Sequence, residues 1–189
     1  MNKLINLLKD RGIKFDLGLT NEELKAAENK YHFRFPPDLR EFLSTALPID
    51  SNLKSKRSFP NWRNLDDPYI KKMLSWPVDG LKFDVENNDF WLKSLGNKPK
   101  NKTEQLERLT KAFLKAPKLI PIFSHRFIPA EPCESGNPIL SFYQPGDVIY
   151  YGADLEDYFL TEFNKQKWMS SNKKLKRIQF WDEVLGYAG

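Results

Sequence analysis

The sequence of 189 residues contains a single cysteine, Cys133, so it cannot form a disulfide within the chain. That scarcity fits a reducing compartment without proving it. There are two histidines, His32 and His125, and their spacing does not match a metal site. The nine glycines form neither a GxGxxG nor a GxxxxGK pattern, which argues against a phosphate-binding loop. We therefore expect neither a metal nor a cofactor.

Long apolar runs are also missing. No stretch approaches the roughly 18 apolar residues of a membrane span. In the first eleven residues the apolar positions are interrupted by Asn6 and followed by Lys9, Asp10 and Arg11, unlike a signal peptide. This segment predicts a short amphipathic helix. We expect a soluble, cytoplasmic protein with no membrane partner.

The sequence also lacks a recognisable arrangement of catalytic residues. His125 would need a nucleophile and an orienting carboxylate such as Glu131 or Glu134 to act as a general base. No serine or cysteine stands in a nucleophile elbow. A histidine with a local hydrogen bond is the better interpretation, so the sequence predicts no enzyme.

What the chain has in quantity is aromatic and charged side chains. Phe, Tyr and Trp make up 14% of the residues, and the formal net charge is +5. The residues from 165 to 177 include six basic and no acidic side chains, whereas those from 127 to 162 include seven acidic and no basic ones. A basic run with Trp168 and Met169 is one way to bind nucleic acid, but such runs are usually solvated surfaces, and we do not expect this partner.

The local patterns predict helices and strands in mixed order. Thr20 and Glu23 form a capping box before a helix from about residue 21 to 31, and Pro37 begins a second helix that Pro48 ends. Asp67 and Pro68 begin a short helix up to about residue 74. A turn at 78–80 and a strand at 81–85 follow, because Leu81, Phe83 and Val85 alternate with polar residues.

In the second half of the chain, Thr103 caps a predicted helix that Pro117 ends. Four strands are expected at about 119–123, 126–128, 139–143 and 148–151, with a turn at 145–147, and two helices near 155–163 and 178–185. No repeat or linker divides the chain, so residues 1–189 form one predicted domain. Its expected core includes the following aromatic and aliphatic residues: Phe42, Phe83, Phe113, Ile122, Tyr150, Phe159 and Trp181. In the pairs Phe90-Trp91, Tyr150-Tyr151 and Phe180-Trp181, one ring is expected in the core and the other at the surface.

Several short motifs follow one another along the chain in a distinctive order. The opening reads Leu19-Thr20-x-x-Glu23-Leu24-x-x-Ala27-Glu28, then Phe35-Pro36-Pro37-Asp38-Leu39-Arg40-Glu41-Phe42-Leu43. Further along stand Trp76-Pro77-Val78, Leu119-Ile120-Pro121-Ile122, Ser135-Gly136-Asn137-Pro138 and Asp147-Val148-Ile149-Tyr150-Tyr151-Gly152. In this order the motifs resemble the longer bacterial members of the SUKH superfamily, which also contains the yeast Smi/Knr cell-wall synthesis regulators.

The resemblance implies an α+β fold in which helices cover a twisted, mainly antiparallel sheet. For bacterial members it implies an immunity protein that binds and neutralises a polymorphic toxin, often a nuclease, and it offers no catalytic residues. The alternative is a regulatory scaffold that binds endogenous partners. The sequence leaves the toxin, its chemistry and the oligomeric state open.

The acidic stretch suggests where a toxin would bind. A nuclease cleft is basic, and carboxylates without compensating cations would steer it. The candidate contact residues are Glu131, Glu134, Asp147, Tyr151, Asp154, Glu156 and Asp157. Each carboxylate also has a local alternative, at a helix start, in a turn or beside prolines.

Overall fold

The computed structural model describes residues 1–51, 58–144, 147–164 and 173–187. Seven α-helices lie in this part of the chain: α1 (Asn2–Asp10), α2 (Asn21–Tyr31), α3 (Pro37–Thr45), α4 (Pro68–Asn87), α5 (Lys102–Phe113), α6 (Leu155–Asn164) and α7 (Trp181–Tyr187). The strands are β1 (Ile13–Leu17), β2 (Ala46–Ser51), β3 (Leu119–Phe123), β4 (Arg126–Pro129), β5 (Ile139–Gln144) and β6 (Asp147–Gly152), and a 3-10 turn, η1, spans Lys93–Leu95. The predicted α+β class is confirmed.

The main sheet is an antiparallel meander in the order β3-β4-β5-β6. All four strands were expected from the sequence. A second, two-stranded antiparallel sheet of β1 and β2 was not. The sequence pattern did not predict β1 because only Ile13 of this strand is fully buried. It did not predict β2 because Pro48 was interpreted as the end of a helix, whereas α3 already ends at Thr45.

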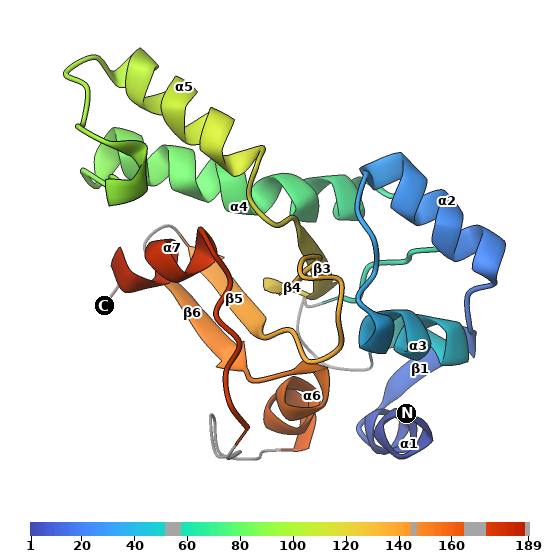
Figure 1. Cartoon of the computed structure of the whole chain (residues 1–189). Helices are drawn as coiled ribbons and strands as arrows, with labels where there is room; N and C mark the ends of the chain where they lie inside the picture. The colour runs from blue at the N-terminus through green and yellow to red at the C-terminus, as the bar shows by residue number, and fades with distance from the viewer. Residues whose placement is uncertain (52–57, 145–146, 165–172, 188–189) are drawn as a thin grey trace.

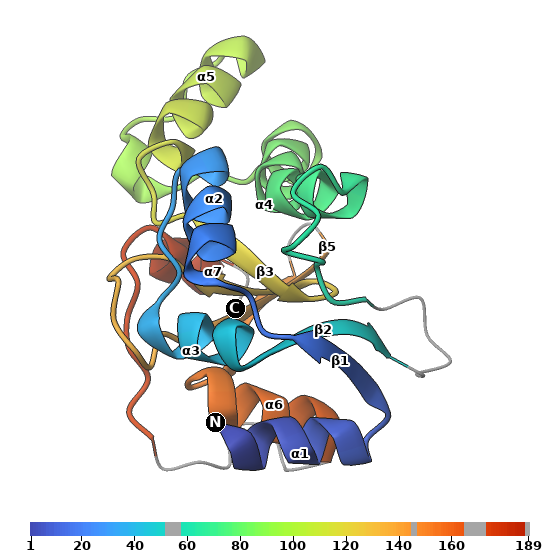
Figure 2. The ribbon, with the colours of Figure 1, turned by 90° about the vertical axis from the view of Figure 1, so that its right-hand side faces the viewer.

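Helices cover both faces of the main sheet. In Figure 2, α4 and α5 lie on one side, whereas α1 and α6 lie side by side on the other. Two hydrophobic cores lie on opposite sides of this sheet, and neighbouring residues of one strand point to different cores. Ile120, Ile128 and Ile139 belong to the first core, and Leu119, Phe127 and Leu140 belong to the second. The two cores are therefore the two faces of one sheet and belong to one body.

The opening motif folds as the sequence predicts. The Thr20 hydroxyl accepts from Glu23 N–H at 3.2 Å, and the Glu23 carboxylate accepts from Thr20 N–H at 2.8 Å. Pro37 occupies the first turn of α3, where its missing N–H costs nothing. Glu28 Oε1 accepts from both Phe35 N–H at 3.1 Å and Arg40 Nη1 at 2.9 Å. These bonds fix α2 and α3 relative to each other.

The prediction for residues 67–85 is wrong after its first turns. Asp67 does cap the helix, but α4 continues through Pro77 to Asn87, so the turn and the strand do not exist. Its buried residues recur at helical spacing: Ile70, Met73, Pro77, Leu81, Asp84 and Val85. The alternation of apolar and polar residues at 81–85 is short enough to fit the period of a strand or that of a helix. Packing on the sheet favours the helix.

The predicted core is confirmed for Phe42, Ile122, Phe159 and Trp181, none of which is more than 3% exposed. Phe83 is wrong at 49% exposed, because position 83 lies on the outer side of the α4 helix. Phe113 and Tyr150 are half-buried.

Three further expectations concern helix ends, a turn and the membrane. Asn101, not Thr103, caps α5: its side-chain oxygen accepts from Thr103 N–H at 2.8 Å. The turn expected at 145–147 falls partly outside the described residues. No described helix is long and apolar enough to cross a membrane.

Candidate functional site

The acidic residues that the sequence singled out lie in two places. Glu131 and Glu134 belong to the loop between β4 and β5. Asp147 and Tyr151 lie on β6, and Asp154, Glu156 and Asp157 lie just before or within the first turn of α6. Figure 1 shows α6 at one end of the main sheet, below β5 and β6.

Lysines from the C-terminal segment compensate several of these carboxylates. Lys176 Nζ lies 3.2 Å from Glu134, and Lys173 Nζ lies 2.6 Å from Asp154 and 3.1 Å from Glu156. Burial lowers the pKa of Lys173, but its hydrogen bonds to the two carboxylates outweigh this and raise the pKa overall. The expectation of an uncompensated acidic surface is therefore wrong, because the fold pairs residues that are remote in sequence. Lys165, Lys167, Trp168 and Met169 of the basic run lie outside the described residues.

Asp157 is buried, so its side chain is not accessible to a partner. It is 1% exposed, its Oδ2 accepts from Ala153 N–H at 2.8 Å, and its own N–H donates to Asp154 Oδ1 at 2.8 Å. Both carboxylates therefore serve the start of α6. Asp154 and Asp157 thus have the structural role at a helix start that the sequence offered as the alternative to partner binding.

Tyr151 supports the sheet from its half-buried position. The Arg126 guanidinium lies 3.9 Å from the centre of the Tyr151 ring, and Arg126 Nη1 donates to Ser141 Oγ at 2.8 Å. Arg126 also lies 3.4 Å from Glu162, with both side chains less than 8% exposed. Asp147 is exposed at the start of β6.

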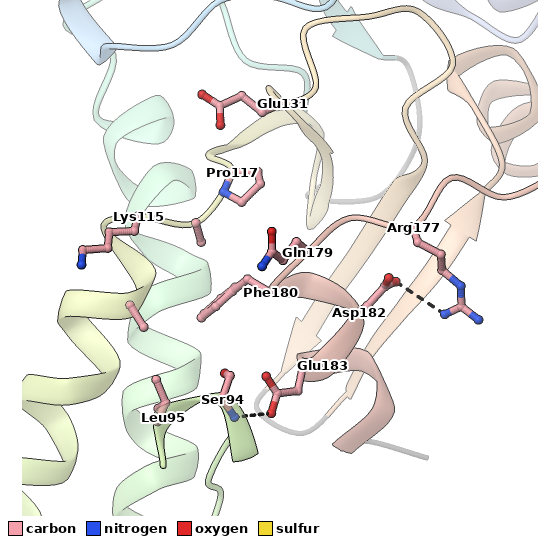
Figure 3. A pocket seen from close by; sticks show the side chains of 12 residues that line it. Ser94, Leu95, Lys115, Pro117, Glu131, Arg177, Gln179, Phe180, Asp182 and Glu183 are labelled. Atoms are coloured by element: carbon pink, nitrogen blue, oxygen red, sulfur yellow. Dashed lines mark hydrogen bonds and ion pairs between the residues drawn. The ribbon is translucent and has the colours of Figure 1, made fainter.

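A hollow in the described surface measures about 830 Å³ and is shown in Figure 3. It lies between the C-terminal end of α5, η1, the start of α7 and the loop that carries Glu131. Leu95, Pro117 and Phe180 contribute apolar surface. The charged residues around it are Lys115, Glu131, Arg177, Asp182 and Glu183.

Hydrogen bonds hold the walls of this hollow in place. Glu183 Oε1 accepts from Ser94 N–H at 2.9 Å, which ties α7 to η1, and Trp181 Nε1 donates to the Pro117 carbonyl at 2.7 Å. The Tyr150 hydroxyl donates to Asp182 Oδ1, and burial followed by this bond raises the pKa of Tyr150. Asp182 also lies 3.5 Å from Arg177.

Phe180 has an unusual backbone at the edge of this hollow. Its φ angle is 71°, in the left-handed region that bulky side chains rarely adopt. The ring lies 5.0 Å from that of Trp181, nearly perpendicular to it, and Figure 3 shows it pointing between α7 and the helices opposite. Trp181 is the buried member of the pair and Phe180 the half-buried one, as expected from the sequence.

A second hollow of about 350 Å³ lies beside the C-terminal end of α2 and also has Glu131 in its lining. Its other residues are Glu28, Asn29, His32, Phe33, Arg34, Ala130 and Cys133. Cys133 Sγ lies 3.8 Å from the Phe35 carbonyl oxygen. His32 and Cys133 lie about a hundred residues apart in the sequence, so no local pattern predicts that they line the same hollow.

Sequence reasoning found one residue of these hollows, Glu131. Ala130 and Cys133 lie near Glu131 in the chain, and the others come from segments in or next to α2, η1, α5 and α7, whose mutual contacts leave no local pattern. The pair Phe180-Trp181 was the one further signal. Within the described residues no group of three or more His, Cys, Asp and Glu side chains is arranged to hold a metal ion. Comparisons with protein-family models, with curated proteins and with solved structures find no match for this chain.

Proposed function

We propose that this chain is a non-catalytic protein-binding module of the SUKH type, an immunity protein that neutralises a bacterial toxin domain such as a nuclease. Its partner is then the toxin itself, held in a stoichiometric complex. The proposal rests on the order of motifs in the sequence and on what the polar residues of those motifs do in the fold.

The observation that carries it is that these polar residues make structural contacts. Glu28 joins α2 to α3. Asp38 Oδ2 accepts from Gly136 N–H at 2.9 Å, which joins α3 to the β4–β5 loop. Asn137, which is fully buried, donates to the Pro129 and Pro132 carbonyls at 2.9 and 2.7 Å. The motifs thus frame the loop that presents Glu131, which suits a binding surface better than a reaction centre.

Co-expression tests the proposal. A toxin domain, sought first among the genes that neighbour this one, is expressed alone and together with the full chain, and growth and co-purification are measured. We expect the toxin domain to arrest growth, the chain to restore it, and the two proteins to elute as one complex. Growth arrest that persists although both proteins are folded would contradict the proposal. Restored growth without any complex would point to a regulatory or enzymatic role instead.

A matched variant controls for loss of the fold. Gly18 lies so close to α3 that a Cβ there would stand 1.9 Å from the Ser44 carbonyl oxygen. Gly18→Val should therefore unfold the chain and abolish protection. Glu86→Lys, an exposed change on α4, should leave protection intact.

A further inference from the structure

Glu131 lines both hollows. One extends from this residue towards α5 and α7, and the other towards the C-terminal end of α2. Together they cross the β4–β5 loop and span about 830 and 350 Å³, more than one side chain fills. Two hollows that share Glu131 leave room for successive side chains of an extended segment of polypeptide.

The charges around Glu131 indicate what such a segment carries there. Glu131 is exposed, and it forms no ion pair within the described part of the chain. Its neighbours Glu134 and Asp182 already face Lys176 and Arg177. Lys115 lines the larger hollow and Arg34 the smaller one, and Glu131 is the carboxylate shared by both hollows that a cation from outside would complement.

The larger hollow adds an apolar contact. Phe180 presents its half-buried ring beside Leu95 and Pro117. A bulky residue with a φ angle of 71° carries backbone strain, and such strain persists where the surroundings hold it. In this conformation the ring faces the hollow, as Figure 3 shows.

We propose that the two hollows bind an extended segment of the partner protein, with an arginine or lysine at Glu131 and an apolar side chain on Phe180. This inference rests on the proposed function and names the chemistry of the bound segment. Arginine suits the position best, because its planar guanidinium matches a carboxylate with two parallel hydrogen bonds.

A random linear peptide library displayed on phage tests this without the toxin. The library is panned against the immobilised full chain, and enriched peptides are synthesised and titrated by fluorescence polarisation. We expect a consensus that combines a basic residue with an aromatic or aliphatic one. Glu131→Lys should weaken binding at least tenfold, whereas Glu86→Lys, the same charge change on α4, should change it less than twofold.

Phe180→Gly separates recognition from folding. Glycine accepts a positive φ angle, so this variant relieves the strain while it removes the ring. We expect a melting temperature within about 3 °C of the wild type, together with at least tenfold weaker peptide binding. A merely structural Phe180 would lower the melting temperature and leave the affinity of the folded protein unchanged.

The inference is overturned if panning enriches no peptide, or if the enriched peptides lack a basic residue and bind the Glu131→Lys variant normally. Either result leaves the proposed function standing when co-expression with the toxin domain still gives a complex. If that complex does not form while peptides bind as expected, the toxin is not the partner, and the two hollows remain a peptide-binding site.

Discussion

At the residue scale, the sequence predicts best where both partners of a contact lie within one helical turn. The capping box of Thr20 and Glu23 is such a case, and it is confirmed. Asn101 and Thr103 show the limit of this reasoning. Both are good N-cap residues, and the sequence does not say at which of them the backbone leaves the extended conformation. The structure assigns the role to Asn101.

This assignment predicts unequal effects of two alanine substitutions. Asn101→Ala should lower the free energy of unfolding by about 1 kcal/mol, because Thr103 N–H loses its acceptor. Thr103→Ala should change it by less than about 0.5 kcal/mol, since its side chain is exposed in the first turn. Urea unfolding followed by circular dichroism measures both, and a larger loss for Thr103→Ala would contradict the assignment.

The Glu23 carboxylate predicts a dependence on pH. Its hydrogen bond from Arg63, followed by the bond from Thr20 N–H, lowers its pKa below the ordinary value of 4.5. A lowered pKa in the folded state means that the stabilisation is present above pH 4.5 and is lost as pH falls through the folded value. Glu23→Gln keeps a side-chain acceptor for the Thr20 N–H but removes the charge.

Urea unfolding at pH 7, 5, 4 and 3 checks this expectation. The wild type should be more stable than Glu23→Gln at pH 7 and 5, and the difference should shrink at pH 4 and 3. A difference that stays constant over this range would show that the charge of Glu23 does not stabilise the fold.

At the scale of elements, the sequence predicted the four strands of the main sheet and most helices, but misjudged two regions. Strand β1 buries only Ile13 and depends on its pairing with β2, which lies about thirty residues further along the chain. Helix α4 runs through Pro77 and Gly80, two residues that usually end helices. In both regions tertiary packing decides, and local pattern does not reveal it.

The helical assignment of residues 81–85 predicts opposite results at Leu81 and Phe83. Leu81 is 1% exposed, so Leu81→Ala should cost about 2–5 kcal/mol of unfolding free energy. Phe83 is 49% exposed, and Phe83→Ala should cost less than about 1 kcal/mol. Denaturant unfolding of the two variants decides between them, because a strand in which both side chains point inward would make both costs large.

At the scale of the whole molecule, the charges of the sequence are rearranged by the fold. The acidic and basic stretches are separate in the sequence, yet Lys173 and Lys176 form ion pairs with Asp154 and Glu134. Such pairing is not predictable from one sequence, because it depends on where the C-terminal segment crosses the sheet. Glu131 stays outside these pairs, and it is the part of the predicted binding site that the account retains.

The central claim, that this chain acts by binding and not by catalysis, is tested most directly by titration. A toxin domain that forms a complex with the chain in co-expression is purified and held at a fixed concentration above the dissociation constant, and its residual activity is measured against added full chain. We expect activity to fall linearly to zero at one equivalent, with Cys133→Ser and wild type giving the same end point. Complete inactivation by a small fraction of an equivalent, increasing with time and lost in Cys133→Ser, would contradict the account and indicate an enzyme.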